Sequence, residues 1–279
     1  MPTTSPADDA RLALTAAQSG AAVVRELYGA PLARVEKSAG DFATEADLAA
    51  ERTMLDLLRA ARPEDAVTGE ESGATGAAGT RRRWLVDPLC GTLNYAVRNM
   101  LVGVNVALRE TGSGITAAAT ADPFHDEVFW TDGTRALLRR NGSDTVLRPS
   151  PDSRLVDLNL DPPFPAFPPA RLLTAPGFAA RFRPRVVSTS LALAWVAAGR
   201  RAAYVTDGGD LRESVHFAAG IALCEAAGCT VTGLDGLPPA ASAGGLVAAA
   251  DARTHAVLMR LIEEQRHVPS SGPGLPRTE

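Results

Sequence analysis

Apolar residues recur every three or four positions in two stretches near the N-terminus, which is the spacing of one face of an α-helix. The pattern predicts a helix over residues 8–28, ended by Gly29, and a second helix over residues 44–60. Thr44 stands where it can cap the second helix, and Asp47 follows three positions later, as in a capping box. Two long helices are therefore expected before the first sheet.

Strand-like segments replace the helical pattern from Trp84 onward, beginning with Trp84, Leu85 and Val86. Four further segments follow, separated by turn residues. We predict that they form an antiparallel sheet; they are LVGVNVALRE (101–110), GITAAATADP (114–123), DEVFWTD (126–132) and RALLRRNG (135–142). The glycine-rich stretch before them, at 73–83, is predicted to be an exposed loop.

The second part of the chain mixes short strands with helices. Helices are expected at 189–199, 214–227 and 254–266, and strands at 171–175, 184–190, 230–236 and 245–250. The proline-dense segment DPPFPAFPPA (161–170) is predicted to link two halves. We expect one compact α+β unit, a layered sandwich with an N-terminal half over 1–150, a C-terminal half over 151–267 and a disordered tail over 268–279.

Composition narrows the range of partners and compartments. The 279 residues are 46% hydrophobic and carry a net charge of −4, which argues against nucleic acid or an anionic membrane as the main partner. No apolar run reaches membrane-spanning length, and MPTTSPADDARLALTAAQSG lacks the pattern of a secretory signal. The cysteines Cys90, Cys224 and Cys229 have no zinc-finger spacing, so a reduced cytoplasm is expected.

Four acidic segments are candidates for chemistry: GDFATEAD (40–47), GEES (69–72), VDPLCGT (86–92) and GGDLRESVHFAAG (208–220). Hard divalent cations such as Mg²⁺ need several oxygen ligands, which usually come from different segments. An aspartate at a strand end, followed by Gly-Thr at a helix start, also offers backbone N–H groups to a phosphate. Together these segments predict metal-assisted phosphoester chemistry.

At this point eight segments, in order, resemble the inositol monophosphatase family, within the superfamily of fructose-bisphosphatases and bisphosphate nucleotidases. They are KSAGDFATEAD, GEES, WLVDPLCGTLNY, ADPFHDEVFW, NG at 141–142, LALAWVAAGR, HFAAGIALCEAAG and GGLVAAADARTH. The resemblance implies an alternating α-β-α-β-α sandwich that usually forms a homodimer. It also implies removal of phosphate from small polyol, sugar or nucleotide phosphates with Mg²⁺.

The resemblance assigns the first metal and the attacking water to particular residues. Glu70 matches a metal-binding glutamate, Asp87 matches the aspartate that bridges two metals, and the carbonyl of Leu89 matches a backbone ligand. Thr92 and Asp47 match the pair that orients the attacking water. These residues make hydrolysis of a phosphate monoester the narrowest prediction.

Substrate contacts are also implied. The N–H groups of Gly91 and Thr92 match the phosphate cradle, and Lys37, the only lysine of the chain, matches a lysine in a mobile loop over the site. Further candidates for contact with a small-molecule substrate are Ser188, Thr189 and Glu213; for the first two, a merely polar turn is the alternative.

Two departures from the family pattern affect the second metal. The family motif Asp-Pro-x-Asp-Gly-Thr has Cys90 in place of its second aspartate, and Trp-Asp-x-Ala-Ala-Gly has His216 in place of its aspartate. A third departure, Ala192, stands where the family often has an acid and makes the substrate pocket differ.

Three hypotheses for Cys90 and His216 follow. The site has decayed and the protein is a non-catalytic binding homologue; or the pair ligates Zn²⁺ or Fe²⁺ instead of Mg²⁺; or the pair performs metal-independent covalent chemistry, such as acyl transfer or addition–elimination. The third hypothesis expects both residues at helix starts. That position would lower the pKa of the Cys90 thiol and keep His216 neutral.

Overall fold

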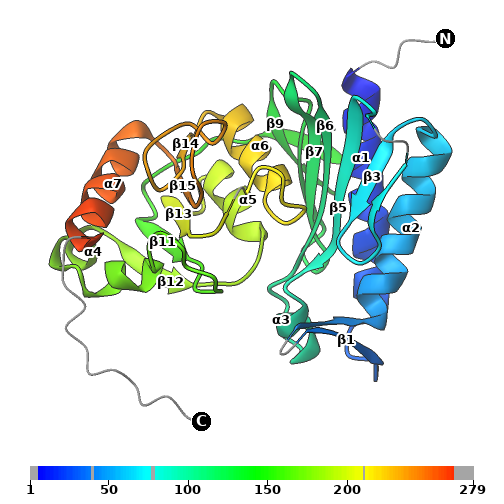
Figure 1. Cartoon of the computed structure of the whole chain (residues 1–279), viewed down its shortest axis with the longest axis horizontal. Helices are drawn as coiled ribbons and strands as arrows, with labels where there is room; N and C mark the ends of the chain where they lie inside the picture. The colour runs from blue at the N-terminus through cyan, green and yellow to red at the C-terminus, as the bar shows by residue number, and fades with distance from the viewer. Residues whose placement is uncertain (1–5, 39–40, 77–78, 210, 267–279) are drawn as a thin grey trace.

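Five layers of helices and strands make up the protein, as the computed structural model shows (Figure 1). The structure describes residues 6–38, 41–76, 79–209 and 211–266. The helical layers are α1 (Pro6–Glu26) with α2 (Glu45–Ala61), then α5 (Leu191–Ala197) with α6 (Ala218–Ala227), and finally α4 (Pro176–Arg181) with α7 (Ala252–Arg266). A sheet separates each pair of helical layers, so the predicted α-β-α-β-α sandwich is confirmed.

The first sheet has eight strands in the order β10-β9-β8-β7-β6-β5-β3-β4. Its members are β3 (Ala66–Gly69), β4 (Gly73–Thr75), β5 (Arg82–Cys90), β6 (Gly103–Glu110), β7 (Gly114–Asp122), β8 (Glu127–Thr131), β9 (Ala136–Arg140) and β10 (Ser143–Val146). The pairs from β5 through β10 are antiparallel, as predicted, whereas β3 runs parallel to β5.

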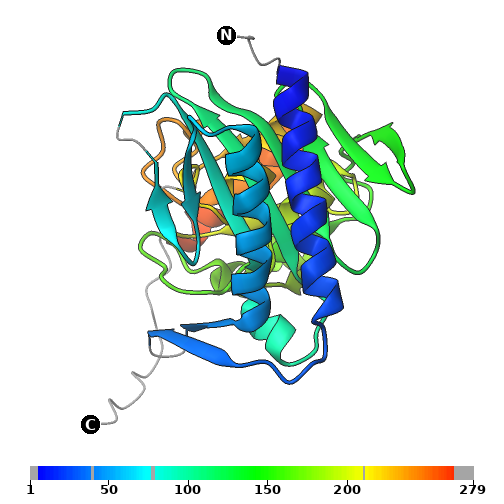
Figure 2. The same cartoon turned by 90° about the vertical axis from the view of Figure 1, so that its right-hand side faces the viewer.

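Helices cover this sheet on both faces. α1 and α2 lie side by side on the outer face (Figure 2), and α6 packs on the inner face against β7. The last six residues of β7 are buried, and most of them are alanines, whose small side chains let helices approach from both sides. This is why the central strands are long apolar runs with few alternating polar positions.

The second sheet has five strands in the order β12-β11-β13-β15-β14. They are β11 (Leu155–Leu158), β12 (Arg183–Val186), β13 (Ala203–Thr206), β14 (Thr230–Thr232) and β15 (Leu246–Ala249). Phe167, Phe178 and Leu258 pack against its outer face in a separate core cluster. The three predicted helices of this half are present, and the helix predicted at 214–227 begins four positions later, at Ala218.

Several predictions for connecting segments are wrong. Residues 171–175 lie largely in a 3₁₀ helix, η1 (Pro169–Thr174), where a strand was expected, because two prolines precede the segment and Pro169 occupies its first turn. Strand β11 already belongs to the second sheet, so the proline-rich segment 161–170 follows the crossing between the sheets and does not make it. The predicted loop at 73–83 contains β4 and the start of β5.

The last strand of the first sheet, β10, ends at Val146, and the first strand of the second sheet, β11, begins at Leu155. The boundary at 150/151 itself stays a prediction. The tail at 268–279 lies outside the described residues. Within the described part of the chain, no helix combines the length and the hydropathy needed to cross a membrane.

Candidate active site

The candidate active-site residues meet where β5 ends. Asp87 and Cys90 lie among the last four residues of β5. The pairing of β5 with β6 shifts register between these two positions. The short helix α3 (Thr92–Ala96) follows directly, close to the hairpin of β1 (Arg34–Ser38) and β2 (Asp41–Thr44) in the lower part of Figure 1. Segments far apart in the sequence therefore supply one site.

Asp87 is the centre of this site and is fully buried. Its Oδ1 accepts the N–H of Leu89 at 3.1 Å. Its Oδ2 accepts from Asn105 Nδ2 at 3.2 Å and lies 2.8 Å from Nδ1 of His216. One ligand atom each from Asp87, Cys90 and His216 lie within 4.8 Å of one another. The two residues that replace family aspartates are thus brought together, as the sequence predicted.

A buried polar network behind Asp87 was not predicted. Asn105 donates from the same Nδ2 to Ser190 Oγ at 2.8 Å, and its Oδ1 accepts from Thr120 Oγ1 at 2.9 Å. All three residues are buried. The signal available in the sequence was a single polar residue inside each of two apolar strands, VNV in β6 and ATA in β7. The network fixes the orientation of the Asp87 carboxylate.

Glu70 lies beside Asp87 and faces Lys37. Lys37 Nζ donates to Glu70 Oε1 at 3.1 Å and to Glu71 Oε1 at 2.6 Å, which brings the predicted lysine to the site. The backbone N–H groups of Glu71 and Ser72 donate to the buried Glu51 carboxylate at 2.8 and 2.9 Å. Glu51 therefore holds the loop that carries Glu70, a function that the sequence did not indicate.

The environment of Glu70 fits a bound cation. Its Oε2 is buried and has no hydrogen-bond donor among the described residues when Glu70 is ionised, whereas a protonated Glu70 donates to Asp87. Burial and the adjacent negative charge of Asp87 raise the pKa of Glu70 to about 9. A divalent cation between the two carboxylates would satisfy the unpartnered oxygen and keep both groups ionised. Glu70, Asp87 and the Leu89 carbonyl are an all-oxygen set of the kind that suits Mg²⁺.

The predicted water-orienting pair is formed. Thr92 Oγ1 donates to Asp47 Oδ1 at 2.9 Å and lies 3.3 Å from the Leu89 carbonyl oxygen. The other carboxylate oxygen of Asp47 accepts the N–H of Thr44 at 2.8 Å, so the predicted capping box of α2 also fixes the Asp47 side chain. Burial raises the pKa of Asp47. The start of α2 and the start of α3 thus share this carboxylate.

The third hypothesis expected a thiolate at Cys90 and a neutral imidazole at His216, and both expectations are wrong. Burial and the nearby Asp87 charge raise the pKa of the Cys90 thiol. Burial opposes charge on His216, but the carboxylate of Asp87 outweighs it and raises the pKa of His216 to about 12. His216 lies in the turn before α6, whose first residue is Ala218, so no helix start favours its neutral form. A metal-free thiolate–imidazole pair is therefore disfavoured.

The candidate substrate contacts are spread over different places. Ser188 Oγ donates to Asp161 at 2.5 Å, and its carbonyl accepts from Asn94 of the segment after Cys90 at 2.8 Å, which places it next to the site. Thr189 is buried, and its hydroxyl accepts the N–H of Leu191 at the start of α5.

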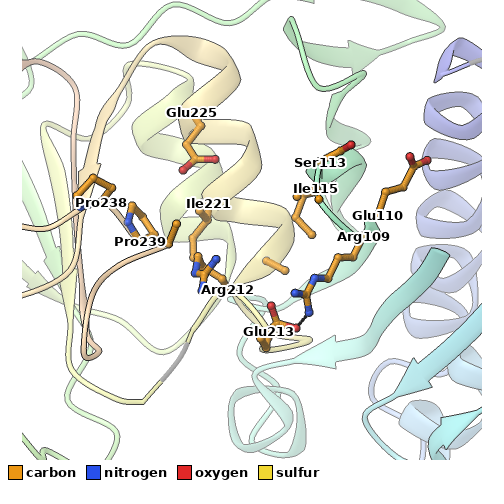
Figure 3. A pocket seen from close by; sticks show the side chains of 14 residues that line it. Arg109, Glu110, Ser113, Ile115, Arg212, Glu213, Ile221, Glu225, Pro238 and Pro239 are labelled. Atoms are coloured by element: carbon orange, nitrogen blue, oxygen red, sulfur yellow. Dashed lines mark ion pairs between the residues drawn. The ribbon is translucent and has the colours of Figure 1, made fainter. Parts of the chain in front are cut away.

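Glu213 faces Arg109 in the structure. It forms an ion pair with Arg109 of β6, and the pair lines a separate pocket of about 460 Å³ between the β6–β7 turn and α6 (Figure 3). The residues that line this pocket include neither Asp87 nor Cys90. The predicted substrate contact of Glu213 therefore has no support in this arrangement.

Comparisons with known proteins agree with the fold. The sequence profile of the inositol monophosphatase family matches residues 7–267. An inositol-1-monophosphatase of Caulobacter vibrioides is 35% identical over 208 residues, 72% of this chain and 78% of that protein. A glucose-1-phosphate thymidylyltransferase of Streptomyces griseus is 36% identical over 143 residues, 51% of this chain and 52% of that protein.

A solved structure gives the same result at the level of the fold. The extragenic suppressor protein suhB from Bartonella henselae superposes with a TM-score of 0.78 at 25% sequence identity, over 91% of this chain and 98% of that chain. The match of the family profile over nearly the whole sequence, together with the shared architecture, identifies the chain as a member of the inositol monophosphatase family.

Proposed function

We propose that the protein hydrolyses the phosphate monoester of a small cyclitol or sugar at the end of β5. The observation that carries the proposal is the Thr92–Asp47 hydrogen bond of 2.9 Å beside the Leu89 carbonyl, with Glu70 and Asp87 adjacent. This arrangement positions a proton acceptor next to an oxygen-ligand cation site. General-base assistance of this kind contributes roughly 10²–10⁴-fold to a rate.

Each residue of the site has a definable task in this reaction. Glu70, Asp87 and the Leu89 carbonyl would hold Mg²⁺, which when bound supplies a Lewis acid that lowers the pKa of water. Thr92 accepts a hydrogen bond from the attacking water while its own proton is directed to Asp47. Lys37 balances the charges of Glu70 and Glu71 and can contact the phosphate. The Gly91 and Thr92 amides, as phosphate donors, stay a prediction from the family pattern.

The substrate class has support from two relatives. The name of one contains a cyclitol monophosphate and the name of the other a hexose 1-phosphate, both small ring polyols that carry one phosphate. The carbonyl of Ser188 accepts from Asn94 of α3, which favours Ser188 as a neighbour of the ring, and Ala192 is buried and carries no charge. A homodimer and a cytoplasmic location are further expectations from the family pattern and the composition.

The test is phosphate release from a panel of inositol monophosphates and hexose 1-phosphates, with and without Mg²⁺. Asp47→Asn should lower kcat about 10²-fold, whereas the control Asp56→Asn, an exposed acid on the same helix, should leave kcat unchanged. Equal activity of Asp47→Asn and the parent protein would contradict the assignment of the water-orienting pair. Phosphate release that does not depend on any divalent cation would contradict the metal-dependent reaction.

A further inference from the structure

We propose that Asp87, Cys90 and His216 form a binding site for a zinc-class divalent ion, distinct from the oxygen-ligand site of Glu70 and Leu89. The proposal deepens the function given above, on which its catalytic meaning rests. Binding itself does not require that function. The inference concerns which metal this chain selects at the position where two aspartates of the family pattern are replaced.

The geometry is close to that of a three-ligand site. One oxygen, one sulfur and one nitrogen atom lie within 4.8 Å of one another, from two segments that are distant in the sequence. Tetrahedral zinc, with bonds of about 2.0–2.3 Å, needs ligand atoms that are roughly 3.2–3.7 Å apart. The separations in the structure are at most 4.8 Å, so small movements of these side chains would bring the atoms into that range.

The site also has the access and support that a metal centre needs. The side chain of His216 is 40% exposed and that of Asp87 is 0% exposed, so an ion can enter from the histidine side while the carboxylate stays fixed. Asn105 holds the Asp87 carboxylate and is itself held by Ser190 and Thr120. Such outer contacts orient ligands and typically account for 10–100-fold in metal affinity.

The chemistry of the donor atoms determines the choice of ion. Mg²⁺ requires near-octahedral oxygen ligands and is bound poorly by thiolate or imidazole. A set of one carboxylate, one thiolate and one imidazole with an open fourth position suits Zn²⁺, Co²⁺ or Fe²⁺. Because Asp87 contacts both Glu70 and His216, one protein could hold a hard ion on one side of Asp87 and a zinc-class ion on the other.

The experiment is a titration of metal-free, reduced protein with Co²⁺, a spectroscopic substitute for zinc. We expect a near-ultraviolet thiolate-to-cobalt charge-transfer band that Zn²⁺ abolishes and that a large excess of Mg²⁺ leaves in place. Cys90→Ser should remove the band. The control Cys229→Ser, at a half-buried cysteine just past the C-terminal end of α6, should retain it in full. Asn105→Ala should weaken Co²⁺ binding by about 10–100-fold.

The outcomes separate this inference from the proposed function. Absence of the band, or an equal band in Cys90→Ser, would overturn the zinc-class site even if Mg²⁺-dependent phosphate release is observed. A Cys90-dependent band in a protein that releases no phosphate would support the site and count against the phosphatase. Circular dichroism of Cys90→Ser, compared with the parent, shows whether loss of the band reflects a lost ligand or a lost fold.

Discussion

The groups on the two sides of the Asp87 carboxylate differ in their chemistry, although Asp87 lies on a single strand, β5. The oxygen side comprises Glu70, the Leu89 carbonyl and the hydrogen-bonded Thr92–Asp47 pair, and all its candidate ligand atoms are oxygens. The soft side comprises Cys90 and His216, which replace two aspartates. Asp87 and Cys90 lie on one strand, β5, so hard and soft ligand atoms are placed within a few residues of each other.

The largest expected effect comes from the residue that the two sides share. Asp87→Asn keeps the size of the side chain and an acceptor for the Leu89 N–H but removes the charge that any cation there requires. We expect Mg²⁺-dependent kcat to fall on the order of 10³-fold, about 4 kcal/mol of transition-state stabilisation. The Co²⁺ band should disappear as well. Retention of either property would show that the two sides do not depend on one carboxylate.

The difference between the two sides can be removed by giving the soft side oxygen ligands as well. The double variant Cys90→Asp/His216→Asp should lose the Co²⁺ thiolate band and gain Mg²⁺-dependent kcat on the order of 10²-fold, because a second hard ion can then stabilise the leaving oxygen. Phosphate release against Mg²⁺ concentration checks this. The single variants are the matched controls, and each should gain less than the double. A double variant no more active than the parent would mean that the site differs from the family in more than its ligands.

The oxygen side depends on a loop that Glu51 holds in place. Glu51→Gln replaces one of the two acceptors of the Glu71 and Ser72 N–H groups with an amide donor, so the loop that carries Glu70 loses one hydrogen bond. We expect Mg²⁺ affinity to fall about 10-fold and the free energy of unfolding to fall by about 1–3 kcal/mol. Co²⁺ binding by Cys90 should be unaffected. Equal losses on both sides would show that Glu51 acts on overall stability and not on the loop alone.

The metal-free protein should become less stable as pH rises from 5 to 9. The pKa of Glu70 is raised to about 9 in the folded protein, whereas the unfolded chain loses this proton near 4.5. The folded state therefore becomes less stable relative to the unfolded state as the pH rises between these two values. The pKa of His216 is raised to about 12, so the stability from its charge is full below about 6.5 and declines above it. Both act in the same direction. The depressed pKa of Asp87 matters only below this window.

Melting temperatures with and without Mg²⁺ at pH 5, 7 and 9 test this expectation. A bound cation replaces the retained proton of Glu70, so the increase in melting temperature that saturating Mg²⁺ produces should be larger at pH 9 than at pH 5. We expect a difference of a few degrees. An increase that is independent of pH would indicate that Glu70 does not bind the ion.

The features of the site that depend on local sequence patterns could be predicted, whereas those that depend on tertiary contacts could not. The helical spacing and the Thr44–Asp47 capping box specify α2, and with it one half of the water-orienting pair. The Asn105–Ser190–Thr120 network depends on β6, β7 and the start of α5 meeting, which no short segment encodes. The raised pKa of Cys90 likewise results from burial beside Asp87 and not from its neighbours in sequence.

The smallest effect is expected for Glu213, a predicted substrate contact that belongs to neither the oxygen side nor the soft side. Glu213 pairs with Arg109, each side chain more than a third exposed, and such pairs contribute about 0–1 kcal/mol to stability. Glu213→Gln should therefore change kcat, KM and the Co²⁺ band less than about twofold, with Glu110→Gln, another acid lining the same pocket, as the matched control. A KM increase of tenfold or more in Glu213→Gln alone would place the substrate in the pocket of Figure 3 and shift the binding site away from Ser188. Because Glu213 lies three residues before His216, a change in kcat without a change in KM would instead show that the Arg109 pair positions the soft side.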